Sequence, residues 1–342
     1  SLAQLGDLLK PRREAVDGPV VYFVDHFFRD HELIGRLPME KGDQLHFVDS
    51  SSEPEVTRID AFKEAVSAAD SRTPCCVVGI GGGNALDTAK AVANLLTNPG
   101  KAEDYQGWEL VKSPAVYKIG IPTLSGTGSE CSRTCVLTNI PKNLKLGMNS
   151  DYTVYDQLLL DPDLLATVPR DQYFYTGIDT FMHCVESLQG SYRNAIIDAF
   201  SVRAVQLCEE IFLSDDMMSE ENREKMMIAS YIGGMAAGNV GVIHPFSAGL
   251  GVVLHVAHGL GNCLALNVLG DIYPKEYKQF RTMIERQGVN LPTGICKDLT
   301  EEQYEGLYRG CIVHEKPLTN ALGPDFKQIL TRENLIERYK SI

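Results

Sequence analysis

The sequence predicts an α/β domain with a Rossmann-like parallel sheet, followed by an all-α domain. Short β-type runs alternate with helical stretches from about residue 20 to residue 121, as they do in parallel α/β sheets. After about residue 165 apolar residues recur at helical spacing, and no clear β-run follows Leu160. A chain of 342 residues is also long for one core and natural for two domains. We therefore expect domains over residues 1–165 and 166–342.

The strands of the first domain are predicted by four apolar runs, at residues 20–24, 44–48, 74–80 and 116–121. The third run is apolar on both faces, which is typical of a central parallel strand. Helical stretches are predicted over residues 26–37, 56–69 and 85–96, and the last of these ends at Thr97-Asn-Pro-Gly100.

The second domain is predicted from four amphipathic stretches, at residues 171–189, 194–213, 219–237 and 256–269. Two proline-containing segments, Leu160-Asp-Pro-Asp163 and Val168-Pro169, mark the boundary before them. Charged stretches over residues 297–305 and 334–340 predict solvated helices, and we assign no chemistry to them.

Composition and charge exclude several classes of protein. With 44% hydrophobic and 23% charged residues, the chain is typical of globular proteins. The net charge of −13 argues against a nucleic-acid partner and against an anionic membrane surface. Nine cysteines without a CxxC pair predict neither a disulfide framework nor a structural zinc site. No signal peptide and no long apolar run is found, so we expect a cytoplasmic location.

Two glycine-rich turns predict a nucleotide site. The first, Gly79-Ile-Gly-Gly-Gly-Asn84, lies between a strand and a helix. There Gly82, Gly83 and Asn84 would bring backbone amides close to a phosphate at the positive end of a helix dipole. Asn84 stands where the usual dinucleotide fingerprint has its third glycine, and a simple tight turn is the alternative interpretation.

The second turn, Pro122-Thr123-Leu-Ser125-Gly126-Thr127-Gly128, follows the next predicted strand. Its threonine and serine hydroxyls suit phosphate and ribose oxygens, and turns after successive strands can meet at one nucleotide. Asp25 ends the first strand, where its carboxylate would accept bonds from a ribose and repel a 2′-phosphate. This favours NAD over NADP, with a solvated loop aspartate as the alternative.

A divalent metal site is predicted in the second half. Asp179 and His183 are four residues apart, which places both on one helix face. His244 and His258 lie further along, also among apolar residues where a solvated histidine is unusual. One carboxylate and three imidazoles suit Fe²⁺ or Zn²⁺. The alternative is four buried polar side chains with ordinary backbone partners.

These motifs resemble the iron-dependent (group III) alcohol dehydrogenase family, which shares its fold with dehydroquinate synthase. The resemblance covers about residues 20–267 and rests on GGGNALDTAK (81–90), PTLSGTGSE (122–130), LLLDPDLLATVP (158–169), GIDTFMHCVE (177–186) and His244 with His258-Gly259. It implies a dehydroquinate synthase-like fold, with a nucleotide-binding domain over residues 1–165 and a helical metal-binding domain over residues 166–342.

The resemblance also implies site residues. The metal ligands would be Asp179, His183, His244 and His258. The cofactor contacts would be Asp25, Gly82, Gly83, Asn84, Asp87, Thr123, Thr127 and Lys145, to which the loop chemistry adds Ser125.

One departure from the family concerns histidine. Some members carry a second histidine four residues after the third ligand, where this sequence has Ala248. His255, three residues before His258, is an addition. We expect His255 on the facing turn of the second ligand helix, as a proton relay or substrate contact, with a histidine packed on the helix face as the alternative.

The implied reaction is hydride transfer between a primary alcohol or aldehyde and NAD. The substrate would be a small alcohol, aldehyde or sugar acid. One branch of the family oxidises the C8 hydroxyl of 3-deoxy-manno-octulosonate for lipopolysaccharide, and its sequence resembles residues 177–187 of this chain. Arg193 could meet a carboxylate or be a plain surface arginine. Two alternatives stay open: an NAD- and metal-dependent carbon–oxygen lyase, and a non-catalytic nucleotide-binding protein. A homodimer is one candidate for the assembly.

Overall fold

A computed structural model describes residues 1–342, in two compact units. The first contains Ser1–Leu124 and Ser129–Leu165, and the second contains Ser125–Gly128 and Ala166–Ile342. None of the helices is both long enough and apolar enough to cross a membrane.

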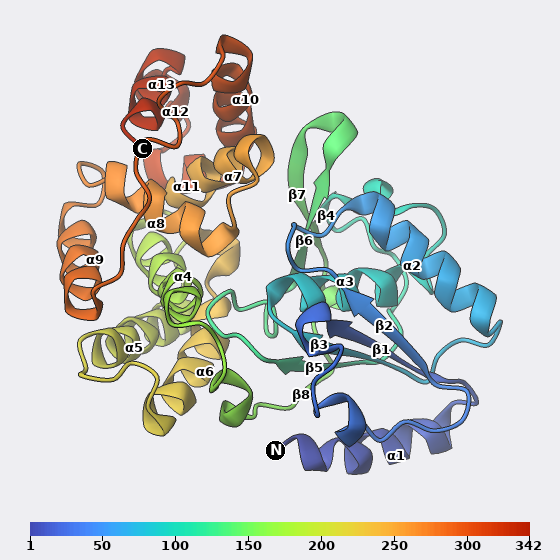
Figure 1. Ribbon diagram of the computed structural model, residues 1–342. Coiled ribbons are helices and arrows are strands. Elements are labelled where there is room, and N and C mark those ends of the chain that lie inside the picture. Colours follow the sequence, from blue (N-terminus) through green and yellow to red (C-terminus); the bar gives the residue numbers. More distant parts are fainter. The chain divides into compact units, whose positions relative to one another are not determined.

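The first unit is built on a five-stranded parallel sheet (Figure 1). Its strands lie in the order β2-β1-β3-β5-β8, and their bounds are β1 (Val20–Asp25), β2 (Gln44–Val48), β3 (Cys76–Gly81), β5 (Lys118–Pro122) and β8 (Gln157–Leu158). The chain runs from β1 outward to β2 and then returns to β3 on the other side of β1. The loops after β1 and β3 therefore leave the sheet at its topological switch point, where open α/β sheets bind their ligands.

Helices cover both faces of this sheet, because successive side chains of a strand point to opposite sides. Val20, Tyr22 and Val24 of β1 belong to one core with helix α1 (Leu5–Ala15). Val21 and Phe23 belong to a second core with α2 (Val56–Ala69) and α3 (Gly83–Leu95). Figure 1 shows α1 on one side of the sheet and α2 and α3 on the other. Helix α3 is buried from Ala85 to Leu95, which fixes the turn that precedes it.

A small second sheet was not predicted from the sequence. Strands β6 (Thr134–Asn139) and β7 (Leu144–Asn149) form an antiparallel hairpin, and β4 (Gly107–Trp108) pairs with β7 in parallel. The hairpin turn is the short helix η5 (Ile140–Lys142) followed by Asn143 in the left-handed region, with φ of 48°.

The helix predicted over residues 26–37 is wrong. That stretch forms two single 3₁₀ turns, η2 (His26–Phe28) and η3 (Ile34–Arg36). The carboxylate of Asp25 accepts a hydrogen bond from the backbone of Phe27 and caps the first turn. The buried residues Phe28 and Leu33 are five positions apart, or about 140° around a helix, which is wider than an apolar stripe of about 100°.

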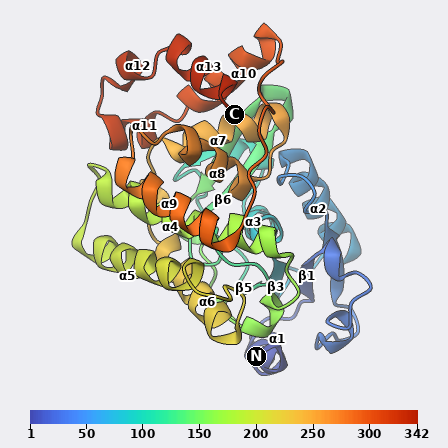
Figure 2. The same ribbon diagram turned by 60° about the vertical axis from the view of Figure 1, so that its left-hand side comes forward.

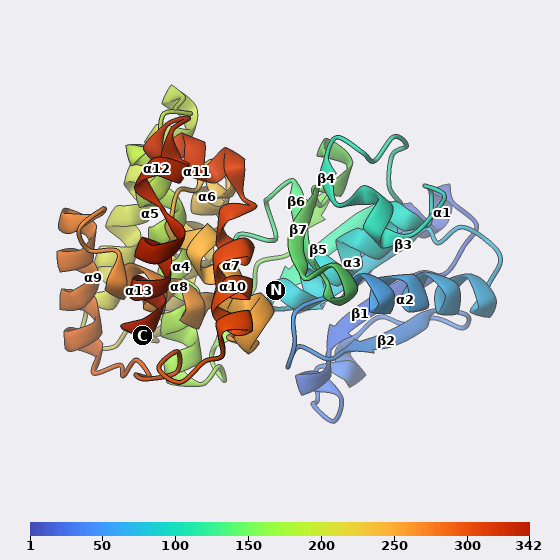
Figure 3. The same cartoon turned by 90° about the horizontal axis from the view of Figure 1, so that it is seen from above.

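The second unit is helical, as predicted. Its longer helices are α4 (Arg170–Gln189), α5 (Ala195–Phe212), α6 (Glu220–Gly234), α7 (Ile243–Leu254), α8 (His258–Val268), α9 (Pro274–Gln287) and α10 (Glu301–Ile312). The chain ends with α11 (Glu315–Leu322), α12 (Phe326–Ile329) and α13 (Arg332–Lys340). Helix α4 packs against α5, α6 and α8, and α7 packs against α8 and α10 (Figures 2 and 3). Helix α4 is therefore the buried centre of this unit.

Candidate metal centre and nucleotide-binding turns

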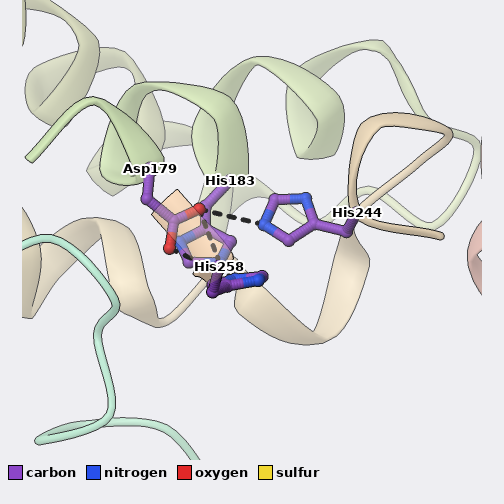
Figure 4. Close-up of side chains that lie close together, drawn as sticks. All are labelled: Asp179, His183, His244 and His258. Carbon is purple, nitrogen blue, oxygen red and sulfur yellow. Dashed lines mark hydrogen bonds and ion pairs between the residues drawn. The ribbon is translucent and has the colours of Figure 1, made fainter. Parts of the chain in front are cut away.

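Four side chains from three helices of the second unit converge on one point (Figure 4). Asp179 and His183 lie one turn apart on the buried face of α4. His244 is the second residue of α7, and His258 is the first residue of α8. One potential ligand atom from each residue lies within 4.8 Å of the others.

The arrangement around the carboxylate of Asp179 fits a metal ion. Nε2 of His244 lies 3.1 Å from its Oδ1, Nε2 of His183 lies 3.7 Å from its Oδ1, and Nε2 of His258 lies 3.4 Å from its Oδ2. Ligands at about 2.1 Å from a tetrahedral zinc ion are about 3.4 Å apart, which is close to these separations. Asp179 is fully buried and its Oδ2 accepts no hydrogen bond, although buried carboxylate oxygens are ordinarily satisfied. The donor set and its orphaned oxygen therefore fit a divalent cation.

The electrostatics of the cluster are dominated by burial and by its carboxylates. Burial lowers the pKa of His183 to about 4, which keeps the imidazole neutral, as a metal ligand must be. Burial alone would raise the pKa of Asp179, but His183, His258 and His244 together hold it well below its usual range. Burial alone would lower the pKa of His244, but Glu186 and Asp179 raise it to about 9.

Two residues beside the cluster were not predicted as site residues from the sequence. Asn262 is fully buried on α8, and its Nδ2 donates to Oδ1 of Asp179 across 2.7 Å. Glu186 on α4 accepts a hydrogen bond from Nδ1 of His244 at 2.5 Å. Spacing could have indicated both, because Asn262 follows His258 by four residues and Glu186 follows Asp179 by seven, positions that share a helix face.

His255 does not lie where we expected it. It is the residue that ends α7, in the left-handed region with φ of 55°, and it is exposed. The expected position on a turn of the following helix is wrong, because α8 begins only at His258. His255 is not one of the four clustered residues. Ala248, where some family members have histidine, is buried within α7. Arg193 is half-exposed and donates to Asp198.

In the first unit, the two predicted glycine turns begin side by side. The backbone N–H of Thr123 donates to the carbonyl oxygen of Gly81 at 3.0 Å, which joins the ends of β5 and β3. Gly82 is the N-cap of α3 and has no side chain with which to cap the helix. The first turn of α3 contains no acidic residue. The amides from Gly83 onward thus present the positive end of a buried helix, which suits an anionic group.

Asp25 borders this turn at the end of β1. Gly81 has φ of 153°, and a Cβ there would lie 2.6 Å from Cβ of Ala85 and 2.9 Å from Cβ of Asp25. Only glycine fits so close an approach, so Gly81 allows the chain at Asp25 to pass close to the glycine-rich turn before α3.

Other predicted cofactor residues make internal contacts in the structure. Nδ2 of Asn84 donates to the carbonyl oxygen of Ser52 at 3.0 Å. The buried carboxylate of Asp87 accepts from Oγ of Ser129 and from the backbone of Val136. The buried ammonium of Lys145 lies 2.9 Å from Oε1 of Glu53. Asn84 and Glu53 also line a pocket of about 300 Å³ at the end of β2.

The remaining predicted residues, Ser125 and Thr127, belong to the four-residue segment of the second unit. Hydrogen bonds hold this segment between two helices: the backbone N–H of Gly126 donates to Ser230 of α6, and Thr180 of α4 donates to the carbonyl of Gly126. Oγ of Ser125 is buried and has no hydrogen-bond partner.

A parallel-sheet unit with a phosphate-type turn and a helical unit with an aspartate–histidine cluster define a class of nucleotide- and metal-binding proteins. Residues 2–162 match the family model described as iron-containing alcohol dehydrogenase. Residues 173–306 match the model of the C-terminal part of the same family. The chain belongs to the iron-containing alcohol dehydrogenase family.

Curated relatives are similar over part of their length. The chain is 34% identical over 220 residues to a sulfoacetaldehyde reductase of Bilophila wadsworthia, an alignment that covers 63% of the chain and 56% of the relative. It is 32% identical over 208 residues to an NAD-dependent methanol dehydrogenase of Bacillus methanolicus, covering 60% and 53%. The match thus spans a little over half the length of these relatives.

Solved structures share the whole fold. A sulfoacetaldehyde reductase from Bifidobacterium kashiwanohense in complex with NAD⁺ has a TM-score of 0.78 at 24% identity, covering 99% of this chain and 93% of the other. An alcohol dehydrogenase from Oenococcus oeni has a TM-score of 0.83 at 21% identity, covering 99% and 95%. These similarities establish the fold expected from the sequence, a parallel-sheet domain followed by a helical domain.

Proposed function

We propose that this chain is a metal-dependent oxidoreductase that transfers hydride between a primary alcohol or its aldehyde and NAD. The observation that carries this proposal is the convergence of Asp179, His183, His244 and His258 within 4.8 Å. Family membership supports it independently, since related enzymes are named as alcohol dehydrogenases and aldehyde reductases.

The four clustered side chains would hold the cation, Fe²⁺ or Zn²⁺, with the carboxylate of Asp179 at their centre. When bound, such a cation supplies a Lewis acid that lowers the pKa of an alcohol hydroxyl. The protein's part is to present neutral imidazoles, as at His183, and to keep the carboxylate buried and ionised, as at Asp179. The fully buried face of α4 excludes water from the back of the site.

The first unit would bind the cofactor. The amides at the start of α3 would contact the pyrophosphate, because that helix end is uncapped and free of acidic residues. Asp25 would accept bonds from a ribose and disfavour a 2′-phosphate. Replacing Asp25 with serine should therefore raise kcat/KM for NADP relative to NAD, and an unchanged ratio would remove Asp25 from this role.

Asp87 and Lys145 are predicted cofactor contacts whose side chains already have partners within the protein. Their side chains are engaged with Ser129, Val136 and Glu53, so they hold the cofactor turn and the hairpin in place. Direct contact with the cofactor would require these pairs to exchange partners. Asn84, Thr123, Ser125 and Thr127 remain proposed contacts of the cofactor.

The substrate class is a small primary alcohol or the corresponding aldehyde. The relatives span methanol and sulfoacetaldehyde, so an anionic substituent is compatible with this family. We propose a substrate panel that contains simple alcohols, sulfoacetaldehyde and 3-deoxy-manno-octulosonate. The last compound tests the narrower expectation that the enzyme oxidises a C8 hydroxyl for lipopolysaccharide synthesis.

A proton-relay role for His255 is a separate part of the proposal. Replacing His255 with asparagine preserves a residue type that tolerates a positive φ, so the end of α7 should stay intact. If His255 relays the proton, turnover should fall by about 100-fold with an altered pH profile. Unchanged turnover and pH profile would reduce its role to ending the helix.

The decisive experiment for the reaction type is NADH absorbance with the metal-loaded protein and the substrate panel. Net formation or consumption of NADH that is lost in Asp179→Ala supports the oxidoreductase. Substrate conversion without a net NADH signal would instead indicate the carbon–oxygen lyase. No conversion, together with unaltered cellular function of Asp179→Ala, would indicate a non-catalytic nucleotide-binding protein.

A further inference from the structure

Glu186 is a fully buried carboxylate that contacts His244, a proposed metal ligand, at the ring nitrogen that does not face Asp179. Nδ1 of His244 lies 2.5 Å from Oε2 of Glu186, and the side chain of Glu186 has no exposed surface. No lysine or arginine pairs with it. Burying a carboxylate without a lysine or arginine partner is costly, so the groups that do contact Glu186 must offset that cost.

The other oxygen of Glu186 is held by the start of α7. Oε1 accepts a hydrogen bond from the backbone N–H of Ile243 at 2.6 Å and from the hydroxyl of Tyr273 at 3.1 Å. The same hydroxyl accepts from the backbone N–H of Val242 at 3.0 Å. Helix α7 has no side-chain cap of its own, so Glu186 and Tyr273 satisfy its first amides from outside. The carboxylate therefore cannot turn away from His244 without breaking these bonds.

Gly241 shows how closely this arrangement is built. A Cβ at that position would lie 2.5 Å from the hydroxyl oxygen of Tyr273 and 3.0 Å from Oε1 of Glu186. The backbone thus passes directly against the Glu186–Tyr273 pair, and a larger residue would push the pair apart.

We infer that Glu186 is a positioning residue of the metal centre, acting through His244. Because a carboxylate only accepts hydrogen bonds, Nδ1 of His244 keeps its proton. Nε2 faces Asp179 and is the nitrogen that would give its lone pair to a cation, which would displace any proton held there. This inference rests on the proposed function, since it concerns the cation that the four clustered residues would hold.

The charge of Glu186 adds a second effect. Asp179 and Glu186 are two buried carboxylates whose only partners of basic type are imidazoles. With neutral imidazoles the group carries two negative charges, which one divalent cation balances. A hydrogen-bonded carboxylate behind a ligand histidine also makes that ligand more basic. Glu186 therefore strengthens the binding of a divalent cation without touching it.

The test is the affinity of the metal-free protein for Zn²⁺ and Co²⁺, measured by competition with a chromophoric chelator. Glu186→Gln keeps an acceptor for Nδ1 of His244 and removes the charge. We expect the dissociation constant to rise 10- to 100-fold, with a changed visible spectrum of the Co²⁺ form. The matched control is Glu276→Gln, a buried carboxylate of α9 that makes no hydrogen bond or ion pair with the four clustered residues, and its affinity should equal that of the wild type.

Wild-type affinity and an unchanged Co²⁺ spectrum in Glu186→Gln would overturn the inference, leave the proposed function standing, and reduce Glu186 to capping α7. If the wild type itself binds no cation, the proposed function fails. If Glu186→Gln does not fold, Tyr273→Phe decides, because it removes one bond that holds the carboxylate. We expect it to weaken binding several-fold, and unchanged binding would overturn the inference.

Discussion

Asn262 donates a hydrogen bond from Nδ2 to Oδ1 of Asp179 across 2.7 Å, inside a fully buried layer between α8 and α4. The same Nδ2 lies 3.3 Å from Nε2 of His258. Asn262 thus touches two of the four clustered residues, although it supplies no charge. We expect it to set the orientation of the Asp179 carboxylate.

Replacing Asn262 with alanine should weaken binding of a divalent cation about 10-fold, because the carboxylate loses the donor that orients it. Calorimetric titration of the metal-free protein measures this. Ser247→Ala is the matched control, since Oγ of Ser247 is buried on α7 and makes no hydrogen bond. Equal affinities for the two variants would contradict an orienting role for Asn262.

The buried ammonium of Lys90 should be a major contributor to the stability of the first unit. It donates to the carbonyl oxygens of Ser129 and Thr134 and lies 3.2 Å from Oδ1 of Asp87. Lys90→Met leaves Asp87 and two carbonyls without this partner, and the expected loss in free energy of unfolding is about 3–5 kcal/mol. Urea unfolding measures it. Lys63→Met, at a lysine bonded to one surface carbonyl, should cost far less, and similar losses would refute the argument.

The backbone at Gly126 should tolerate no side chain. Its φ is 142°, and a Cβ would lie 1.7 Å from the carbonyl oxygen of Thr176. Gly126→Ala should therefore destabilise the protein by about 3 kcal/mol or more, as seen in the denaturation midpoint. Gly238→Ala, at a position with no atom within 4 Å of its Cβ, should leave the midpoint nearly unchanged. A tolerant Gly126 would mean that the turn after β5 differs from the one described.

Part of the loss of folding stability at low pH should come from protonation of Asp43. Both of its oxygens bond the guanidinium of Arg13, and the backbone N–H groups of Val20 and Glu40 also donate to it. Burial alone would raise the pKa of Asp43, but these bonds outweigh burial and lower it.

A lowered pKa in the folded state means that the unfolded chain binds more protons in acid. The stabilisation by Asp43 is therefore complete above the unfolded pKa and is lost as the pH falls through the folded pKa. Asp43→Asn should cost about 2 kcal/mol at neutral pH. The difference from the wild type should shrink below pH 4, an approximate bound set by the ordinary aspartate pKa. A difference that stays constant down to the acid transition would show that the charge of Asp43 is not involved.

Sequence periodicity predicted most of the fold because strands and helices here are strongly apolar. Strands β3 and β5 are buried throughout, β1 is buried except for its last residue, Asp25, and α4 buries a continuous stretch from Thr176 to Ser187. The β6–β7 hairpin was missed because both strands mix buried with half-buried residues, and β6 is joined to α3 by a bond between residues far apart in the sequence, from the backbone of Val136 to Asp87. The segment after β1 was predicted as a helix because local propensity does not show where Phe28 and Leu33 are buried.

The site was predictable to the extent that it follows helix spacing. Asp179 and His183 share a face of α4, and the same spacing relates His258 to Asn262, a relation that was overlooked. Tyr273 had no signal of its own, because its contacts with Glu186 and Val242 join residues far apart in the sequence. The left-handed conformation of His255 could not be predicted from the sequence either, since it follows from where α7 ends and α8 begins.

The most direct test of the central claim is the metal content of the purified protein, measured by mass spectrometry beside that of Asp179→Ala and His244→Ala. If these residues hold one catalytic cation, the wild type reconstituted with Fe²⁺ or Zn²⁺ should retain one ion per chain after gel filtration. Both variants should retain almost none while keeping their helical circular dichroism. Equal retention in the wild type and in the variants, or none in any of them, would contradict a metal centre at Asp179, His183, His244 and His258.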